Sequence, residues 1–182
     1  MNLKTLCLCL CCFLFLGTAQ DEETIMWNEN RKLTWADFKG EVNRGTDAVA
    51  LTASGITFGY SLSRTDGRIT GFRTTVEAHF YPHKSWFIEE KADDYILGHE
   101  QLHFDITELY TRKLRQQISQ LRVSQSIKSQ LDNLHSNINE ALAKTQNEYD
   151  SQSRHSIDSV YQRRWEAFIE TELKKLDHFK SK

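Results

Sequence analysis

The stretch Asp94-Tyr-Ile-Leu-Gly-His-Glu-Gln-Leu-His-Phe-Asp105 contains the pattern His-Glu-x-x-His. Apolar residues recur along it and beyond it at intervals of three and four, which predicts a partly buried amphipathic helix. His99 and His103 stand four positions apart. On a helix, their imidazoles are about 40° apart around the axis and roughly 6 Å apart along it. Two imidazoles placed in this way can bind one metal ion.

Glu100 directly follows the first of these histidines and has a chemical interpretation of its own. Zinc lowers the pKa of a bound water to about 7, and a neighbouring carboxylate can take the proton as the oxygen attacks a carbonyl. The motif therefore predicts a Zn²⁺ site with His99 and His103 as ligands and Glu100 as the general base. Chance occurrence on a solvated helix is the alternative, and the apolar neighbours of the motif argue against it.

A catalytic zinc ion usually takes three protein ligands and keeps one position open. His155 is the favoured third ligand, because it lies in a polar break, 149–156, where a loop can turn a side chain back toward the first helix. Asp150 is the alternative third ligand, or an acceptor that orients an imidazole. Asp105 and Glu108 are predicted to point away from the ion, each either forming a buried hydrogen bond or pairing with Arg112 at the surface. We expect three further histidines at the surface: His79, His83 and His135.

The first nineteen residues have the pattern of a secretory signal peptide. Lys4 precedes an apolar run, 6–16, and Gly17-Thr-Ala19 supplies small residues for cleavage near Ala19. All four cysteines lie in this segment, which predicts a mature protein with no disulfide and no cysteine zinc site. We expect export to the periplasm or the medium, without a membrane span in the mature chain. A lipid anchor on Cys11 or Cys12 is less favoured, because the residue before each is not small.

Composition narrows the class of protein further. The chain has 182 residues, a formal net charge of −2 and 26% charged residues. Acidic and basic residues are interspersed without a basic stripe, so a nucleic-acid partner is not expected. Residues 20–182 are enough for a single domain with one core. The oligomeric state is not indicated by any of these features.

The mature chain divides near residue 90 into a β-rich part, 20–90, and a helical part, 91–182. Thr34 and Asp37 predict a capped helical turn at 35–38. Segments 48–63 and 68–81 are rich in β-branched and aromatic residues and flank a turn at 65–67, which predicts an antiparallel hairpin or meander that Pro82 closes.

Apolar spacing in the second part predicts three helices, at about 92–122, 125–147 and 156–177. The fold class expected is α+β, with an N-terminal antiparallel sheet followed by a helical half that carries the His-Glu-x-x-His helix.

Several segments together resemble the DUF922 family, a group of bacterial secreted proteins predicted to be zinc-dependent proteases. They are Arg31–Gly40, Ser85-Trp86, Leu97–Glu108, Tyr149–His155, Gln162 and Trp165. The resemblance implies a zincin-like metallopeptidase domain over 20–182. It also implies His99 and His103 as ligands, Glu100 as catalytic base, and His155 as the downstream ligand or active-site histidine. The chain has Gln152, Ser153 and Ser156 where the family motif has Glu, Thr and Gly.

The function expected is therefore that of a secreted zinc-dependent metallopeptidase that hydrolyses peptide or protein substrates. Two alternatives remain: a zinc-dependent amide hydrolase acting on cell-wall peptides, and a non-catalytic secreted zinc-binding protein. Glu100 favours an enzyme over the last, because a structural site needs no carboxylate beside its first ligand.

Overall fold

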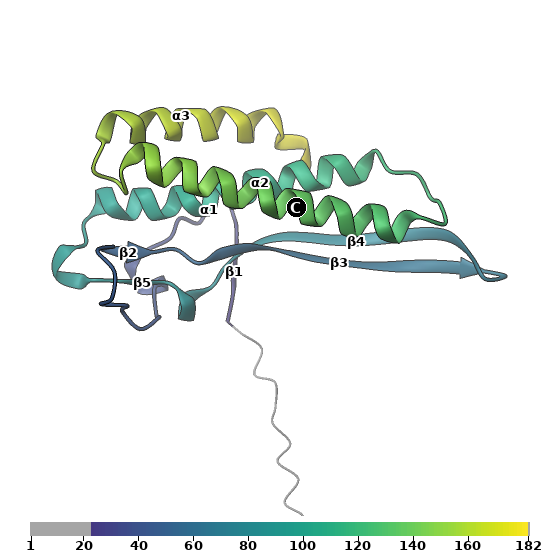
Figure 1. Ribbon diagram of the computed structural model, residues 1–182, viewed down its shortest axis with the longest axis horizontal. Helices are drawn as coiled ribbons and strands as arrows, with labels where there is room; N and C mark the ends of the chain where they lie inside the picture. The colour runs from purple at the N-terminus through teal and green to yellow at the C-terminus, as the bar shows by residue number, and fades with distance from the viewer. Residues whose placement is uncertain (1–22, 182) are drawn as a thin grey trace, which may run out of the picture.

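A computed structural model describes residues 23–181, so the predicted signal peptide and all four cysteines lie outside the described residues. An antiparallel sheet occupies the N-terminal part and three long helices follow it (Figure 1). The α+β class, with the sheet first, is confirmed.

A long hairpin forms most of the sheet. Strands β3 (Ser54–Thr65) and β4 (Arg68–Phe80) pair antiparallel, and the short β1 (Ile25–Met26) adds to the other edge of β4. Asp66 and Gly67 connect the two long strands, both with positive φ, at 49° and 75°. Two such residues form a turn whose twist matches that of the strands, and glycine adopts this backbone readily. The predicted hairpin is therefore confirmed.

The predicted strand 48–63 is wrong in one respect, because the structure divides it. Its first part is β2 (Ala50–Leu51), which leaves the hairpin and pairs antiparallel with β5 (Trp86–Phe87). Between β2 and β3, the Ala53 N–H donates to Ser85 Oγ at 2.9 Å, so a side chain takes the place of a strand partner. This break lets β2 run beside the first long helix.

Short helical turns complete the N-terminal part. The predicted turn at 35–38 is found as a 3₁₀ helix at Trp35–Asp37, and the Thr34 N–H donates to Asp37 Oδ2 at 2.8 Å, as the capping pattern indicated. Gly40 follows, and its N–H donates to Ser85 O at 2.8 Å. A Cβ at this position would lie 2.8 Å from the same oxygen, so the approach requires glycine. Two more 3₁₀ turns lie at Pro82–Lys84 and Glu89–Lys91.

The three predicted helices are present with shifted ends. They are α1 (Asp94–Ser119), α2 (Ile127–Ser153) and α3 (Ser159–Lys175), and a 3₁₀ turn at Asp177–Phe179 follows them. Asp93 and Asp158 cap α1 and α3 by accepting backbone N–H groups of the first turn.

The predicted polar break at 149–156 is mostly wrong, because α2 continues six residues past 147. The fully buried Tyr149 extends the apolar face of α2, so packing keeps the chain helical despite its polar neighbours. Arg154, His155 and Ser156 then end the helix with φ values of 52°, 52° and 71°. Asp150 therefore lies on a helix and His155 in a short, left-handed connection.

The helices cover one face of the hairpin, with α1 against β3 and β4, and with α3 packed on α1 and α2 (Figure 1). Apolar side chains from the hairpin and all three helices form the main core, including Val76, Ile106, Leu131, Tyr149 and Ile169. A second cluster joins the N-terminal segment and β4 to α1 through Trp27, Phe38, Phe80 and Phe104. Within residues 23–181, no helix has the length and apolar character needed to cross a membrane.

Candidate metal centre

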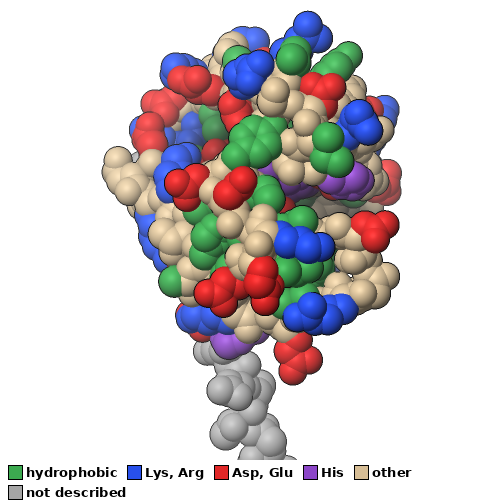
Figure 2. All heavy atoms as spheres, turned by 90° about the vertical axis from the view of Figure 1, so that its left-hand side faces the viewer, with side chains coloured by type: hydrophobic (Ala, Val, Ile, Leu, Met, Phe, Trp, Pro, Cys, Tyr) green, Lys and Arg blue, Asp and Glu red, His purple; other side chains and the backbone are tan. Residues whose placement is uncertain are grey.

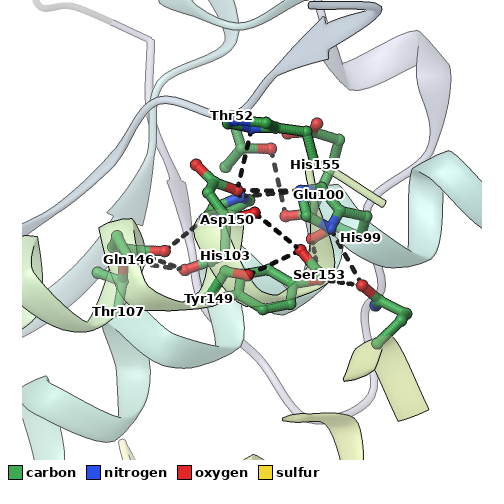
Figure 3. A network of polar contacts seen from close by, with 11 residues as sticks. Thr52, His99, Glu100, His103, Thr107, Gln146, Tyr149, Asp150, Ser153 and His155 are labelled. Atoms are coloured by element: carbon green, nitrogen blue, oxygen red, sulfur yellow. Dashed lines mark hydrogen bonds and ion pairs between the residues drawn. The ribbon is translucent and has the colours of Figure 1, made fainter. Parts of the chain in front are cut away.

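Side chains from two helices bring three possible metal ligands together (Figure 3). His99 and His103 project from successive turns of α1, and Asp150 projects from the last turns of α2. Asp150 Oδ1 lies 3.2 Å from His99 Nε2 and 2.9 Å from His103 Nε2, and the two Nε2 atoms are 3.2 Å apart. This His99–His103–Asp150 group could hold a metal ion.

The outer nitrogens of both imidazoles contact glutamine side chains. His103 Nδ1 is hydrogen-bonded to Gln146 Oε1, and the Gln146 amide donates to the backbone oxygen of His103 at 2.9 Å. His99 Nδ1 lies 3.1 Å from Gln162 Oε1, which also accepts the Tyr149 hydroxyl at 2.7 Å. Since Gln146 comes from α2 and Gln162 from α3, all three helices contribute to the site.

Tyr149 is buried and packs against both histidines of the group. Its ring stacks on His99 with centroids 4.6 Å apart and meets the His103 ring edge-on at 4.9 Å. Burial raises the pKa of the Tyr149 phenol and outweighs the lowering effect of its hydrogen bond to Gln162, so this hydroxyl remains a neutral donor.

Glu100 is buried next to the group, with 4% of its surface exposed. Its backbone oxygen accepts a hydrogen bond from Thr52 Oγ1 at 3.2 Å, which ties α1 to the residue that follows β2. Its carboxylate Oε2 is buried and has no hydrogen-bond partner among residues 23–181. Such an atom is rare in folded proteins and often marks a functional group.

The electrostatics of the group reflect how closely its members approach. Burial lowers the pKa of His103, but the hydrogen bond to Asp150 and the negative charges of Glu100 and Asp150 outweigh it, so the pKa is raised. Burial raises the pKa of Asp150, whereas hydrogen bonds to His103 and His99 lower it, and the net pKa is well below the usual range. The site therefore attracts positive charge.

The structure includes Asp150, the alternative third ligand, in the group and leaves His155 at its edge. His155 Nδ1 lies 3.8 Å from Asp150 Oδ1, and its side chain is 76% exposed, against 30% for Asp150. In Figure 3, Tyr149 lies on one side of Asp150 and His155 on the other. The assignment of His155 as third ligand stays a prediction.

Two nearby acids point away from the group, as predicted: Asp105 contacts the N-terminal segment, and Glu108 pairs within α1. Asp105 accepts a hydrogen bond from Trp27 Nε1 at 2.7 Å. Glu108 is fully buried and accepts from Arg112 Nε at 2.8 Å, so this pair is internal rather than at the surface.

The histidines expected at the surface differ from one another. His83 is exposed, as predicted. His79 is half-buried and bonds Thr57 Oγ1 at 2.7 Å. His135 is also half-buried, because α2 packs on β3 and brings its ring to 4.8 Å from that of Phe58.

Sequence reasoning missed Gln146 completely and cited Gln162 only as part of a motif. An amide side chain is neither a usual zinc ligand nor a general base, so its residue type does not indicate a role at a catalytic site. Its spacing from Asp150 does indicate that it lies near the group, because Gln146 stands four positions before Asp150 and so shares its face of α2.

The group lies at the end of the molecule where β2, the start of α1 and the connection between α2 and α3 meet. Figure 2 faces this end and shows histidine side chains at the surface beside hydrophobic ones. The chain is thus an α+β protein with a partly buried His–His–Asp group, of a composition suited to metal binding.

Comparison with protein-family models places the chain in a known family. Residues 30–156 match the family described as "Bacterial protein of unknown function (DUF922)", and the chain belongs to this family. Comparison with curated proteins and with solved structures found no match.

Proposed function

We propose that this protein is a zinc-dependent peptidase, exported by the segment at its N-terminus. The observation that carries the proposal is the convergence of His99 Nε2, His103 Nε2 and Asp150 Oδ1 beside the buried carboxylate of Glu100, one oxygen of which has no hydrogen-bond partner within residues 23–181. A metal-binding group explains the first three side chains, and general-base chemistry explains the fourth.

The spacing of the three atoms suits zinc. Ligand atoms about 2.0–2.2 Å from a tetrahedral zinc ion are separated from one another by roughly 3.3 Å. The separations found, from 2.9 to 3.2 Å, are close to this value. Two imidazoles and one carboxylate form a ligand set that catalytic zinc uses, and three protein ligands leave a fourth position for water or substrate.

Bound zinc acidifies water and polarises a carbonyl group. Glu100 takes one proton from the attacking water as the new carbon–oxygen bond forms. It then passes that proton to the leaving nitrogen as the carbon–nitrogen bond breaks. The products are a carboxylic acid and an amine, so the reaction consumes one water per bond and needs no other reactant.

Strand β2 supports a peptide as the substrate. It lies at an edge of its two-stranded sheet and leads into Thr52, whose hydroxyl donates to the backbone of Glu100. An extended peptide can add to such an edge through backbone hydrogen bonds, which would align it with the catalytic residues. A sheet packed against the motif helix also agrees with a zincin-like arrangement.

Hydrolysis of fluorescein-labelled casein by the zinc-loaded protein, compared with Glu100→Gln, tests the proposal. The variant keeps the size of the side chain and removes the base, so it should retain zinc and lose at least about a hundredfold in rate. Glu140→Gln makes the same change on the exposed face of α2 and should have no effect. Equal activity in wild type and Glu100→Gln would contradict the proposed role of Glu100, and hydrolysis of cell-wall peptides in place of casein would favour the alternative amide hydrolase.

A further inference from the structure

The hydrogen bonds around the two histidines determine which ring nitrogen carries a proton. The Gln146 amide donates to a backbone carbonyl, the oxygen of His103, at 2.9 Å. A carbonyl can only accept, so the atom that Gln146 turns toward His103 Nδ1 is its oxygen. His103 Nδ1 must then be the donor in their hydrogen bond.

The orientation of the Gln162 amide, on the other side of the group, follows from its hydrogen bonds in the same way. Its amide donates to Glu166 Oε1 at 3.0 Å, and its oxygen accepts the Tyr149 hydroxyl at 2.7 Å. A reversed amide would place its oxygen against the Glu166 carboxylate, which has no proton to offer. His99 Nδ1 is therefore also a donor, to Gln162 Oε1 at 3.1 Å.

We propose that Gln146 and Gln162 are positioning residues that hold His103 and His99 in the Nδ1–H form, so that both Nε2 lone pairs face the metal position. This inference rests on the metal site of the proposed function and extends it to two residues outside the motif. Both glutamines are well placed for the role, since Gln162 is fully buried and Gln146 half-buried.

The choice of an amide has an electrostatic consequence. Carboxylates often accept from the outer nitrogen of a zinc-bound histidine and add negative charge to the site. Here both acceptors are neutral, so they add no negative charge to that of Asp150 and Glu100. A zinc ion held by this group would keep more of its power to polarise water than it would with two further carboxylates.

Gln146→Met and Gln162→Met test the proposal, because methionine has a similar length and no strong acceptor. Each variant should bind zinc about ten- to hundredfold more weakly than wild type, the usual effect of losing such a partner. In NMR spectra of the zinc-loaded protein, Gln146→Met should abolish the protected Nδ1–H signal of His103 and leave that of His99. Gln162→Met should do the opposite, a selectivity that general loss of structure would not produce.

Two controls separate positioning from packing. Gln130→Met makes the same change on α2, where the amide bonds the Ser124 and Ser126 hydroxyls, and should leave zinc affinity and both signals unchanged. Gln146→Glu keeps an acceptor and should keep the His103 signal. If Gln162→Met does not fold, the two Gln146 variants decide the question.

Several outcomes would overturn the inference. They are zinc affinity within twofold of wild type in both methionine variants, signals that persist in both, or an equal loss in Gln130→Met. If the wild-type protein hydrolyses casein and any of these results is found, the proposed function stands and only the role of the two glutamines is contradicted. If the methionine variants lose zinc affinity as expected but the wild-type protein hydrolyses no peptide, the role of the glutamines stands and the proposed function is contradicted. A wild-type protein that binds no zinc would overturn both.

Discussion

Asp150 Oδ1 lies 2.9 Å from His103 Nε2, although 47 positions separate the two residues in the chain. The contact exists because α2 runs back along α1 and remains helical to Ser153. It adds a third possible ligand to the pair of histidines on α1. The predictions about metal binding depend on this third member of the group.

The purified protein should contain about one zinc ion per chain, and His99→Ala or His103→Ala should lose most of it. Each substitution removes one of the converging nitrogens, and a structural or catalytic zinc needs at least three protein ligands. Metal analysis after dialysis measures the content. His83→Ala, an exposed histidine bonded to Glu23, serves as the control and should keep its zinc. Full zinc content in both α1 variants would remove the metal site.

Asp150→Ala should weaken zinc binding more than His155→Ala. Asp150 Oδ1 lies within 3.2 Å of both nitrogens, whereas His155 Nδ1 is 3.8 Å from that oxygen and its ring is largely in solvent. We expect a loss of more than about a hundredfold for Asp150→Ala, because the effect of removing a ligand should exceed that of removing a ligand's partner. Competition with a chelator of known affinity gives both constants. The opposite order would assign the third position to His155.

Zinc affinity should fall as the pH is lowered, starting above pH 6.5. Zinc binds the neutral imidazole, so a proton on Nε2 of His103 must leave first, while the proton on Nδ1 stays. The pKa of His103 is raised above its ordinary value of 6.5, which moves the onset of proton competition to higher pH. Below the raised pKa, one competing proton costs about tenfold in affinity per pH unit. An affinity that is constant from pH 8 to pH 5 would contradict a histidine-based site.

Chelation should lower the melting temperature. Zinc that binds the folded chain and not the unfolded chain stabilises the fold by about 2.7 kcal/mol when the free zinc concentration is a hundredfold above Kd. For a chain of this size, that amount corresponds to a shift of roughly 5–10 °C. Thermal unfolding with excess zinc and with EDTA measures the difference. His99→Ala should show little difference between the two conditions, and an equal shift there would trace the effect to zinc bound elsewhere.

Glu108→Ala should destabilise the fold by about 3–5 kcal/mol without changing zinc content. The substitution removes the carboxylate that the buried Arg112 guanidinium contacts at 2.8 Å, and breaking a buried ion pair by removing one partner costs this much. Denaturant unfolding gives the free energy. The exposed Glu140→Ala should change it by less than about 0.5 kcal/mol. A similar small value for Glu108→Ala would show that the pair does not stabilise the folded chain.

Local patterns predicted the local features of this protein well. The Asp66-Gly67 turn, the Thr34–Asp37 cap and the helical spacing of His99 and His103 depend on neighbours within a few residues, and each is present. The class of fold follows from the same information, because strand and helix periods separate cleanly near residue 90.

Tertiary structure decided the rest. The chain was expected to loop at Tyr149, yet burial of this ring against His99 and Trp165 keeps α2 helical and directs Asp150 at the group. The division of the strand at Thr52 and the placing of Gln146 and Gln162 also depend on contacts between distant segments. By itself the sequence determined which side chains two turns of α1 present together. Which third ligand and which acceptors meet them was decided by packing among three helices, because no local pattern records contacts made across 43 to 63 positions.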